Sequence, residues 1–187
     1  MYTFLTELLG YLINKNFELN PVFFDMYADN NVVFYNVYNF IFFIYFLYVY
    51  WSFEKTNSYK KHIIFLTIGF LAISILNVFL QKFLIKSQIY SYTFGGLALI
   101  YCIFIFFKEN NRILRQKIAK QSLLFWISVG LLIFYITYIP IKIYYSISSF
   151  ENMELYYNIK RIHLSAVGIM YCFIIYGFIQ MKGKLKA

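Results

Sequence analysis

Long uncharged apolar runs alternate along this chain with short polar segments that carry most of its charge. A helix needs about 20 residues, at 1.5 Å each, to cross a hydrocarbon core about 30 Å thick. Five runs reach this length, and a shorter N-terminal run that contains Glu7 does not. The runs lack the alternation of membrane β-strands. The pattern therefore predicts helical segments near residues 1–14, 31–53, 62–81, 87–107, 121–141 and 162–181.

Composition places these helices in a lipid bilayer. Of 187 residues, 61% are hydrophobic, 24% aromatic and 13% charged, whereas a soluble domain averages about a quarter charged. A soluble core cannot bury so many all-apolar helices, because each needs a polar outer face. We therefore predict an all-α fold, a polytopic transmembrane helical bundle of about six segments, with five full spans and a short N-terminal one. Residues 1–187 form a single integral membrane domain in this interpretation.

The connections between most runs are short, so we expect neighbouring helices to be antiparallel and adjacent. The exception is the stretch from Lys142 to Arg161, where mixed aromatic and charged residues predict a long connection at the membrane interface. Small residues let membrane helices approach closely. We expect this role for the pair Gly168 and Cys172, and for Gly95 and Gly96.

The net charge of +9 does not indicate a nucleic-acid partner, because the basic residues lie mainly beside the ends of apolar runs. Eleven basic residues fall in the second connection, the fourth connection and the C-terminal tail, against six in the others. The positive-inside rule then predicts a cytoplasmic C-terminus. We expect the chain in a bacterial cytoplasmic (inner) membrane.

Three polar residues are candidates for a ligand-binding cluster: Asn39, Asn77 and His163. Asn39 lies about 12 Å in from the outer end of its helix, Asn77 falls in the same outer half, and His163 opens the last helix at that side. The alternative for the asparagines is interhelical hydrogen bonding, worth about 0.6 kcal/mol. His62 lies at the opposite side, so the two histidines cannot share a metal. We predict no metal and no cofactor.

Tyrosines also gather on one predicted helix. Tyr35, Tyr38 and Tyr45 fall within about a quarter of its circumference, next to Asn39, and either line a cavity or anchor the helix at the interface. The chain has no nucleophile elbow, no phosphate loop and no pair of intramembrane carboxylates. No catalytic residue is therefore assigned.

Three stretches carry a resemblance: YNVYNFIFFIYFLY (35–48), SLLFWISVGLLIFY (122–135) and RIHLSAVGIMYCFIIYGF (161–178). In these the chain resembles an uncharacterised family of small polytopic integral membrane proteins of Bacteroidota-type bacteria. The resemblance implies a helical bundle that lacks one N-terminal span, and a glutamate in the family near the position of Asn39. It implies no activity.

Three classes of function remain. The first is a non-enzymatic membrane protein, a sensory or accessory module with a membrane-protein partner or a second copy of itself. The alternative is a small transporter or an oligomeric channel. The third, which we favour least, is a membrane enzyme acting on lipid or quinone, with His163 as base or ligand.

Overall fold

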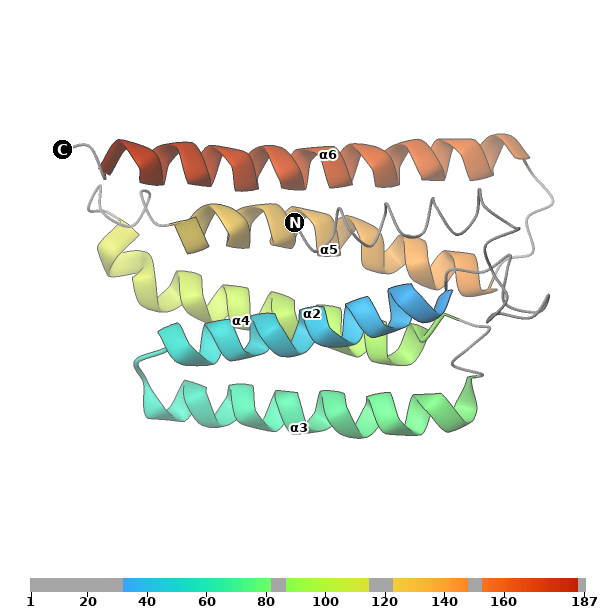
Figure 1. Cartoon of the computed structure of the whole chain (residues 1–187), viewed down its shortest axis with the longest axis horizontal. Coiled ribbons are helices and arrows are strands. Elements are labelled where there is room, and N and C mark those ends of the chain that lie inside the picture. Colours follow the sequence, from blue (N-terminus) through green and yellow to red (C-terminus); the bar gives the residue numbers. More distant parts are fainter. Residues whose placement is uncertain (1–31, 82–86, 115–122, 148–152, 185–187) are drawn as a thin grey trace, which may run out of the picture. The chain divides into compact units, whose positions relative to one another are not determined.

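A computed structural model describes residues 32–81, 87–114, 123–147 and 153–184 of the chain. These residues are almost entirely helical and contain no strand. The predicted N-terminal segment near residues 1–14, with Glu7, lies outside them. The described helices are α2 (Val32–Phe53), α3 (Asn57–Leu80), α4 (Ile89–Leu114), α5 (Leu123–Ile147) and α6 (Met153–Lys184), as Figure 1 shows.

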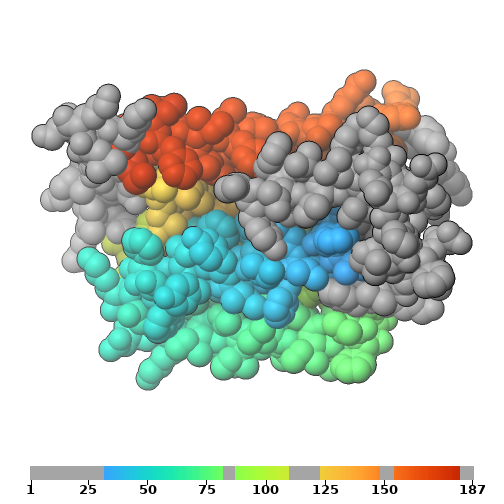
Figure 2. Space-filling view, in the orientation of Figure 1, coloured from blue at the N-terminus to red at the C-terminus, as the bar shows by residue number. Residues whose placement is uncertain are grey.

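All five helices contain a segment long and apolar enough to cross a membrane. This confirms the all-α membrane class and the five full spans predicted from the apolar runs. The outward residues of α3 fit a lipid environment, because Phe65, Ile68 and Phe79 are exposed and can contact acyl chains. Figure 2 shows part of the surface of α2 and α3, coloured blue to green.

The prediction of a long connection from Lys142 to Arg161 is wrong. Helix α5 continues past Pro140 to Ile147, and α6 begins at Met153. An apolar run marks the part of a helix that fits the hydrocarbon, whereas backbone hydrogen bonding continues through the interface. A proline inside a membrane helix is tolerated when local adjustments satisfy the freed backbone groups.

The described residues group into two compact units, which divide within α4 between Gly95 and Gly96. In unit 1, helices α2 and α3 lie side by side and antiparallel (Figure 1). Their short connection is closed by the buried Glu54, whose Oε1 accepts hydrogen bonds from the backbone N–H groups of Lys55 and Thr56, each at 2.9 Å. These bonds pair two amides before α3, of which that of the N-cap residue Thr56 has no partner within the helix.

Aromatic rings fill the core of unit 1. The Phe43 ring contacts those of Phe70 and Tyr92, with both pairs of centroids 5.5 Å apart. A Cβ atom at Gly95 would lie 2.8 Å from the Phe43 ring, which is closer than real side chains pack. Gly95 therefore makes room for this ring against α4, as the predicted packing role requires.

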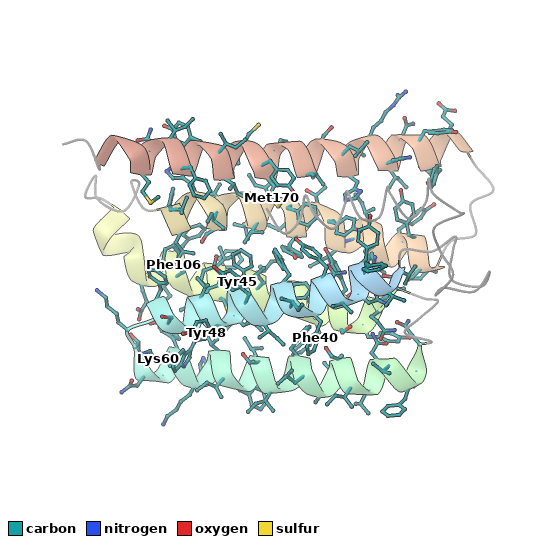
Figure 3. All side chains as sticks on the ribbon, viewed as in Figure 1. Phe40, Tyr45, Tyr48, Lys60, Phe106 and Met170 are labelled. Atoms are coloured by element: carbon teal, nitrogen blue, oxygen red, sulfur yellow. The ribbon has the colours of Figure 1, made fainter. Side chains whose placement is uncertain are left out.

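Unit 2 brings α5 and α6 side by side and antiparallel (Figure 1). A Cβ atom at Gly130 would lie 3.0 Å from the carbonyl oxygen of Met170, which Figure 3 labels between these helices. A Cβ atom at Gly177 would lie 2.8 Å from Cβ of Trp126. Both glycines therefore permit a close approach of the two helices. Gly96 has a similar role on α4, 2.8 Å from Ile139 Cδ1 by the same measure.

The packing role predicted for Gly168 and Cys172 is wrong. A Cβ atom at Gly168 would meet no atom of the described residues within 4 Å, and Cys172 is exposed. Gly168 lies nine positions before Gly177, and at 3.6 residues per turn this puts the two on opposite faces of α6. The contact with α5 uses the face of Gly177.

Candidate ligand-binding cavity

Unit 1 contains a cavity of about 300 Å³ between α2, α3 and the first turns of α4. Each helix contributes both apolar and polar side chains to its surface. The lining residues are Asn36, Val37, Asn39, Phe40, Phe43, Phe70, Ser74, Ile75, Val78, Gln88, Ser91 and Tyr92.

One end of the cavity is aromatic. The ring of Phe40 stacks on that of Phe70 with centroids 5.8 Å apart, and Phe43 contacts both Phe70 and Tyr92. Figure 3 labels Phe40 on the side of α2 that faces α3. These rings line the apolar part of the cavity.

The other end is polar and is organised around Gln88, which is 7% exposed. Its backbone N–H donates a hydrogen bond to Asn36 Oδ1 at 3.2 Å. Its side-chain Nε2 donates to the backbone carbonyl of Gln81 at 2.9 Å. In return, Gln81 Oε1 accepts a bond from the N–H of Ile89 at 3.0 Å. These bonds connect the end of α3 to the start of α4 and hold the Gln88 side chain at the cavity.

Asn77 stands behind this polar end and is 1% exposed. Its Nδ2 donates to Ser91 Oγ at 3.1 Å, and the Ser91 hydroxyl donates to the carbonyl of Gln88 at 3.2 Å. The chain of bonds therefore runs from α3 into the first turn of α4. Asn77 positions a cavity residue, Ser91, without lining the cavity itself.

Three buried polar atoms at this end have no hydrogen-bond partner among the described residues: Gln88 Oε1, Asn77 Oδ1 and Ser74 Oγ. Leaving a buried polar atom without a partner costs about 1–3 kcal/mol. Such atoms are rare in folded proteins, and they commonly mark a place where another molecule supplies the missing bond.

The lining of the cavity changes from polar to aromatic with distance from the helix ends, as a bilayer changes from polar surface to apolar core. Asn36 lies about 6 Å from the start of α2, and Phe43 about 16 Å from it, at 1.5 Å per residue. On α3, Ser74 and Phe70 lie about 9 Å and 15 Å from the helix end. The polar end is therefore near the end of the helices, and the aromatic end is deeper.

The residues predicted to form one cluster fall in different units. Asn39 lines the cavity and Asn77 supports it, both in unit 1. His163 belongs to unit 2. A site shared by all three stays a prediction. The predicted tyrosine stripe does not line this cavity: Tyr35 and Tyr45 are exposed, and α2 lines it with another face that includes Asn36 and Phe40.

His163 is half-buried in an aromatic cluster between α5 and α6. Its ring stacks on Tyr138, with centroids 4.3 Å apart and planes 18° apart, and lies 6.2 Å from Phe134. The Lys142 ammonium is 5.9 Å from the centre of the Tyr138 ring. These contacts join the two helices. Within the described ranges, no three His, Cys, Asp or Glu side chains are close enough to hold a metal ion.

Sequence reasoning missed the polar residues nearest the helix ends: Asn36, Ser74, Gln88 and Ser91. A signal for two of them was present, because Asn36 and Asn39 are three positions apart, as are Ser74 and Asn77. This spacing places both members of a pair on one face of a helix. Gln88 and Ser91 gave no such signal, since their importance comes from contacts with α2 and α3.

The chain matches no protein-family model, no curated protein and no solved structure. The family resemblance of the three stretches therefore stays a prediction, and the function has to be argued from the cavity.

Proposed function

We propose that this chain is a non-enzymatic integral membrane protein, a sensory or accessory module, that binds a small molecule in the cavity of unit 1. The observation that carries the proposal is the cavity itself, about 300 Å³ in volume, with aromatic rings at one end and the buried Gln88 amide at the other. Binding sites for small molecules are typically 300–1,000 Å³, mostly apolar, with a few convergent polar groups.

The chemistry of the lining supports binding more than catalysis. The polar groups that the described residues place there are amides and hydroxyls, from Asn36, Asn39, Ser74, Gln88, Ser91 and Tyr92. Amide side chains do not ionise near neutral pH, so they hold and orient a ligand but are poor acids and bases. The unpaired Ser74 hydroxyl has no adjacent base to activate it among the lining residues.

A sensory or accessory role also needs a second protein that responds when the ligand binds. We propose a membrane-protein partner or a second copy of this chain, which would contact the exposed apolar surface of the helices. Binding in the cavity would change the spacing of α2 and α3, because the ligand lies between them.

Filling the cavity with a side chain tests the proposal. A cavity of about 150 Å³ admits benzene, so the phenyl ring of Ser74→Phe would occupy about half of the space. Ala72→Phe is the matched control, because Ala72 is exposed on α3 and does not line the cavity. The full chain and both variants would be extracted into lipid nanodiscs, and bound small molecules identified by native mass spectrometry.

We expect the natural chain and Ala72→Phe to retain the same small molecule and Ser74→Phe to lose it. Equal retention by all three would place the molecule outside the cavity and contradict the proposal. Ion conductance by the natural chain in liposomes, abolished by Ser74→Phe, would favour a channel or a transporter instead.

A further inference from the structure

We propose that the ligand of the unit 1 cavity is a neutral ring-containing alcohol or phenol, whose hydroxyl donates a hydrogen bond to Gln88 Oε1. This inference rests on the proposed function, since it names the chemical class of the molecule bound there. Three features of the cavity carry it: the direction of the missing hydrogen bond, the absence of charge among the described lining residues, and the size and aromatic character of the apolar end.

The direction of the missing bond follows from the orientation of the Gln88 amide. Its Nε2 lies 2.9 Å from the carbonyl oxygen of Gln81, which can only accept a hydrogen bond. The nitrogen must therefore point at Gln81, and the atom without a partner among the described residues is the oxygen. A carbonyl oxygen only accepts, so the ligand has to supply a donor.

Ser74 selects among the possible donors. Its hydroxyl lines the same cavity and has no partner within the described part of the chain. A hydroxyl can both donate and accept, so a ligand hydroxyl matches in kind both the acceptor of Gln88 and the hydroxyl of Ser74. An ether or a ketone can only accept, and it would leave Gln88 Oε1 unpaired.

The lining restricts the charge of the ligand. No described lining residue is charged. An ionised group inside a membrane protein is costly without a partner of opposite charge. A carboxylate, a phosphate or an ammonium group would find no partner of opposite charge among the described lining residues, and a neutral donor group needs none.

The apolar end restricts size and shape. The cavity is about 300 Å³, about twice the volume of one that admits benzene. The rings of Phe40, Phe43 and Phe70 line it, and aromatic rings pack favourably against one another by offset stacking and by edge-to-face contact. A molecule of about two fused rings fits both constraints.

Three probes of nearly equal shape separate these requirements. 2-Naphthol carries a donor and is neutral at pH 7, 2-methoxynaphthalene can only accept, and naphthalene can do neither. Binding to the full chain in nanodiscs would be measured by equilibrium dialysis, with empty nanodiscs subtracted to remove partitioning into lipid. We expect 2-naphthol to bind about tenfold more tightly than the other two, the effect of one hydrogen bond to an otherwise unpaired buried acceptor.

Substitutions test whether the tighter binding of 2-naphthol depends on Gln88. Gln88→Met keeps the length of the side chain but removes the acceptor, so the three probes should bind within about twofold of one another. Gln180→Met is the matched control, because Gln180 lies on α6 in unit 2, and it should keep the tenfold preference. If Gln88→Met does not fold, the comparison of the three probes on the natural chain still decides the inference.

The possible results separate this inference from the proposed function. Equal binding of the three probes, abolished by Ser74→Phe, would overturn the hydroxyl inference and leave the cavity as a binding site. Tighter binding of 2-methoxynaphthalene would overturn it in favour of an acceptor ligand. No binding of any probe above that of empty nanodiscs would overturn the inferred ligand class, whereas the proposed function is decided by whether the natural chain retains a small molecule that Ser74→Phe loses.

Discussion

Unit 1 and unit 2 each pair two antiparallel apolar helices, but they fill the space between the helices differently. In unit 2, Gly130 and Gly177 lie at the contact and bring the backbones of α5 and α6 close together. In unit 1, the rings of Phe40 and Phe70 stand between α2 and α3, and a cavity of about 300 Å³ remains beside them.

The difference shows what glycine and phenylalanine do at helix contacts in a membrane. Lipid gives helices no hydrophobic drive to associate, so close contact of backbones is a main source of stability. Large rings keep the backbones of two helices further apart, and in unit 1 a cavity lies beside such rings. Unit 2 therefore has the arrangement of a structural contact between helices. Unit 1 has that of a candidate binding site, where a buried polar atom such as Gln88 Oε1 has no partner among the described residues.

The largest effect should come from a side chain placed in the contact of unit 2. Gly130→Leu should lower the free energy of unfolding by about 3 kcal/mol, because the backbone carbonyl of Met170 cannot move away without shifting α6. Unfolding would be followed by titration with SDS in mixed micelles. Gly168→Leu is the control and should change stability by less than about 0.5 kcal/mol, since a Cβ there meets no atom within 4 Å in the part of the chain that the structure describes. Equal losses would refute the assigned contact face of α6.

A larger side chain in the cavity of unit 1 is expected to raise the free energy of unfolding instead of lowering it. Ser74→Phe should raise the free energy of unfolding of the ligand-free chain by about 1 kcal/mol, because it fills empty volume and removes a hydroxyl without a partner among the described residues. Ala72→Phe, on the exposed face of α3, should have no measurable effect in the same titration. A loss of stability in Ser74→Phe alone would mean that the cavity is too small to hold the phenyl ring.

At the aromatic cluster of unit 2, loss of a ring is expected to lower the free energy of unfolding by about as much as Ser74→Phe raises it. Tyr138→Leu removes the stacking on His163 and should lower the free energy of unfolding by about 1 kcal/mol. Tyr171→Leu, which replaces an exposed ring on α6, serves as the control. The imidazole proton resonances of His163 should move downfield in the NMR spectrum of Tyr138→Leu alone, because the ring current of the stacked tyrosine is lost. Unchanged resonances would contradict the stacking.

The smallest effect concerns the hydrogen bond of Asn77 to Ser91. A double-mutant cycle with Asn77→Leu and Ser91→Ala should give a coupling energy of about 0.6 kcal/mol, the average for such bonds between membrane helices. The cycle would be measured as differences in the free energy of unfolding. A coupling above about 1.7 kcal/mol would exceed the range for such bonds and would assign Asn77 a larger structural role than its single bond explains.

The fold could be predicted from the sequence because the length of an apolar run limits what it can form in a bilayer. The ends of the helices could not be predicted equally well. Residues 142–147 and 153–161 are helical although they mix aromatic and charged side chains. Hydropathy reports which residues prefer lipid, whereas a helix ends where its backbone finds other hydrogen-bond partners.

The candidate site could be predicted only in part. Depth in an apolar run singled out Asn39, which lines the cavity, and Asn77, which bonds to the lining residue Ser91. The unpaired oxygen of Gln88 could not be predicted, because it depends on the bond from its own nitrogen to Gln81, seven residues earlier. Whether His163 shares a site with the asparagines stays a prediction.

The length of α6 has a mechanical consequence. Its 32 residues form a rod about 48 Å long, whereas the hydrocarbon core is about 30 Å thick. Membrane helices tilt by about 0–40°, and even the upper end of this range would leave part of α6 outside the core. A change in bilayer thickness alters the tilt of such a rod, and a rotation of about 10° around its midpoint moves each end sideways by about 4 Å. A change in membrane thickness would therefore appear at the two ends of α6 as a sideways displacement.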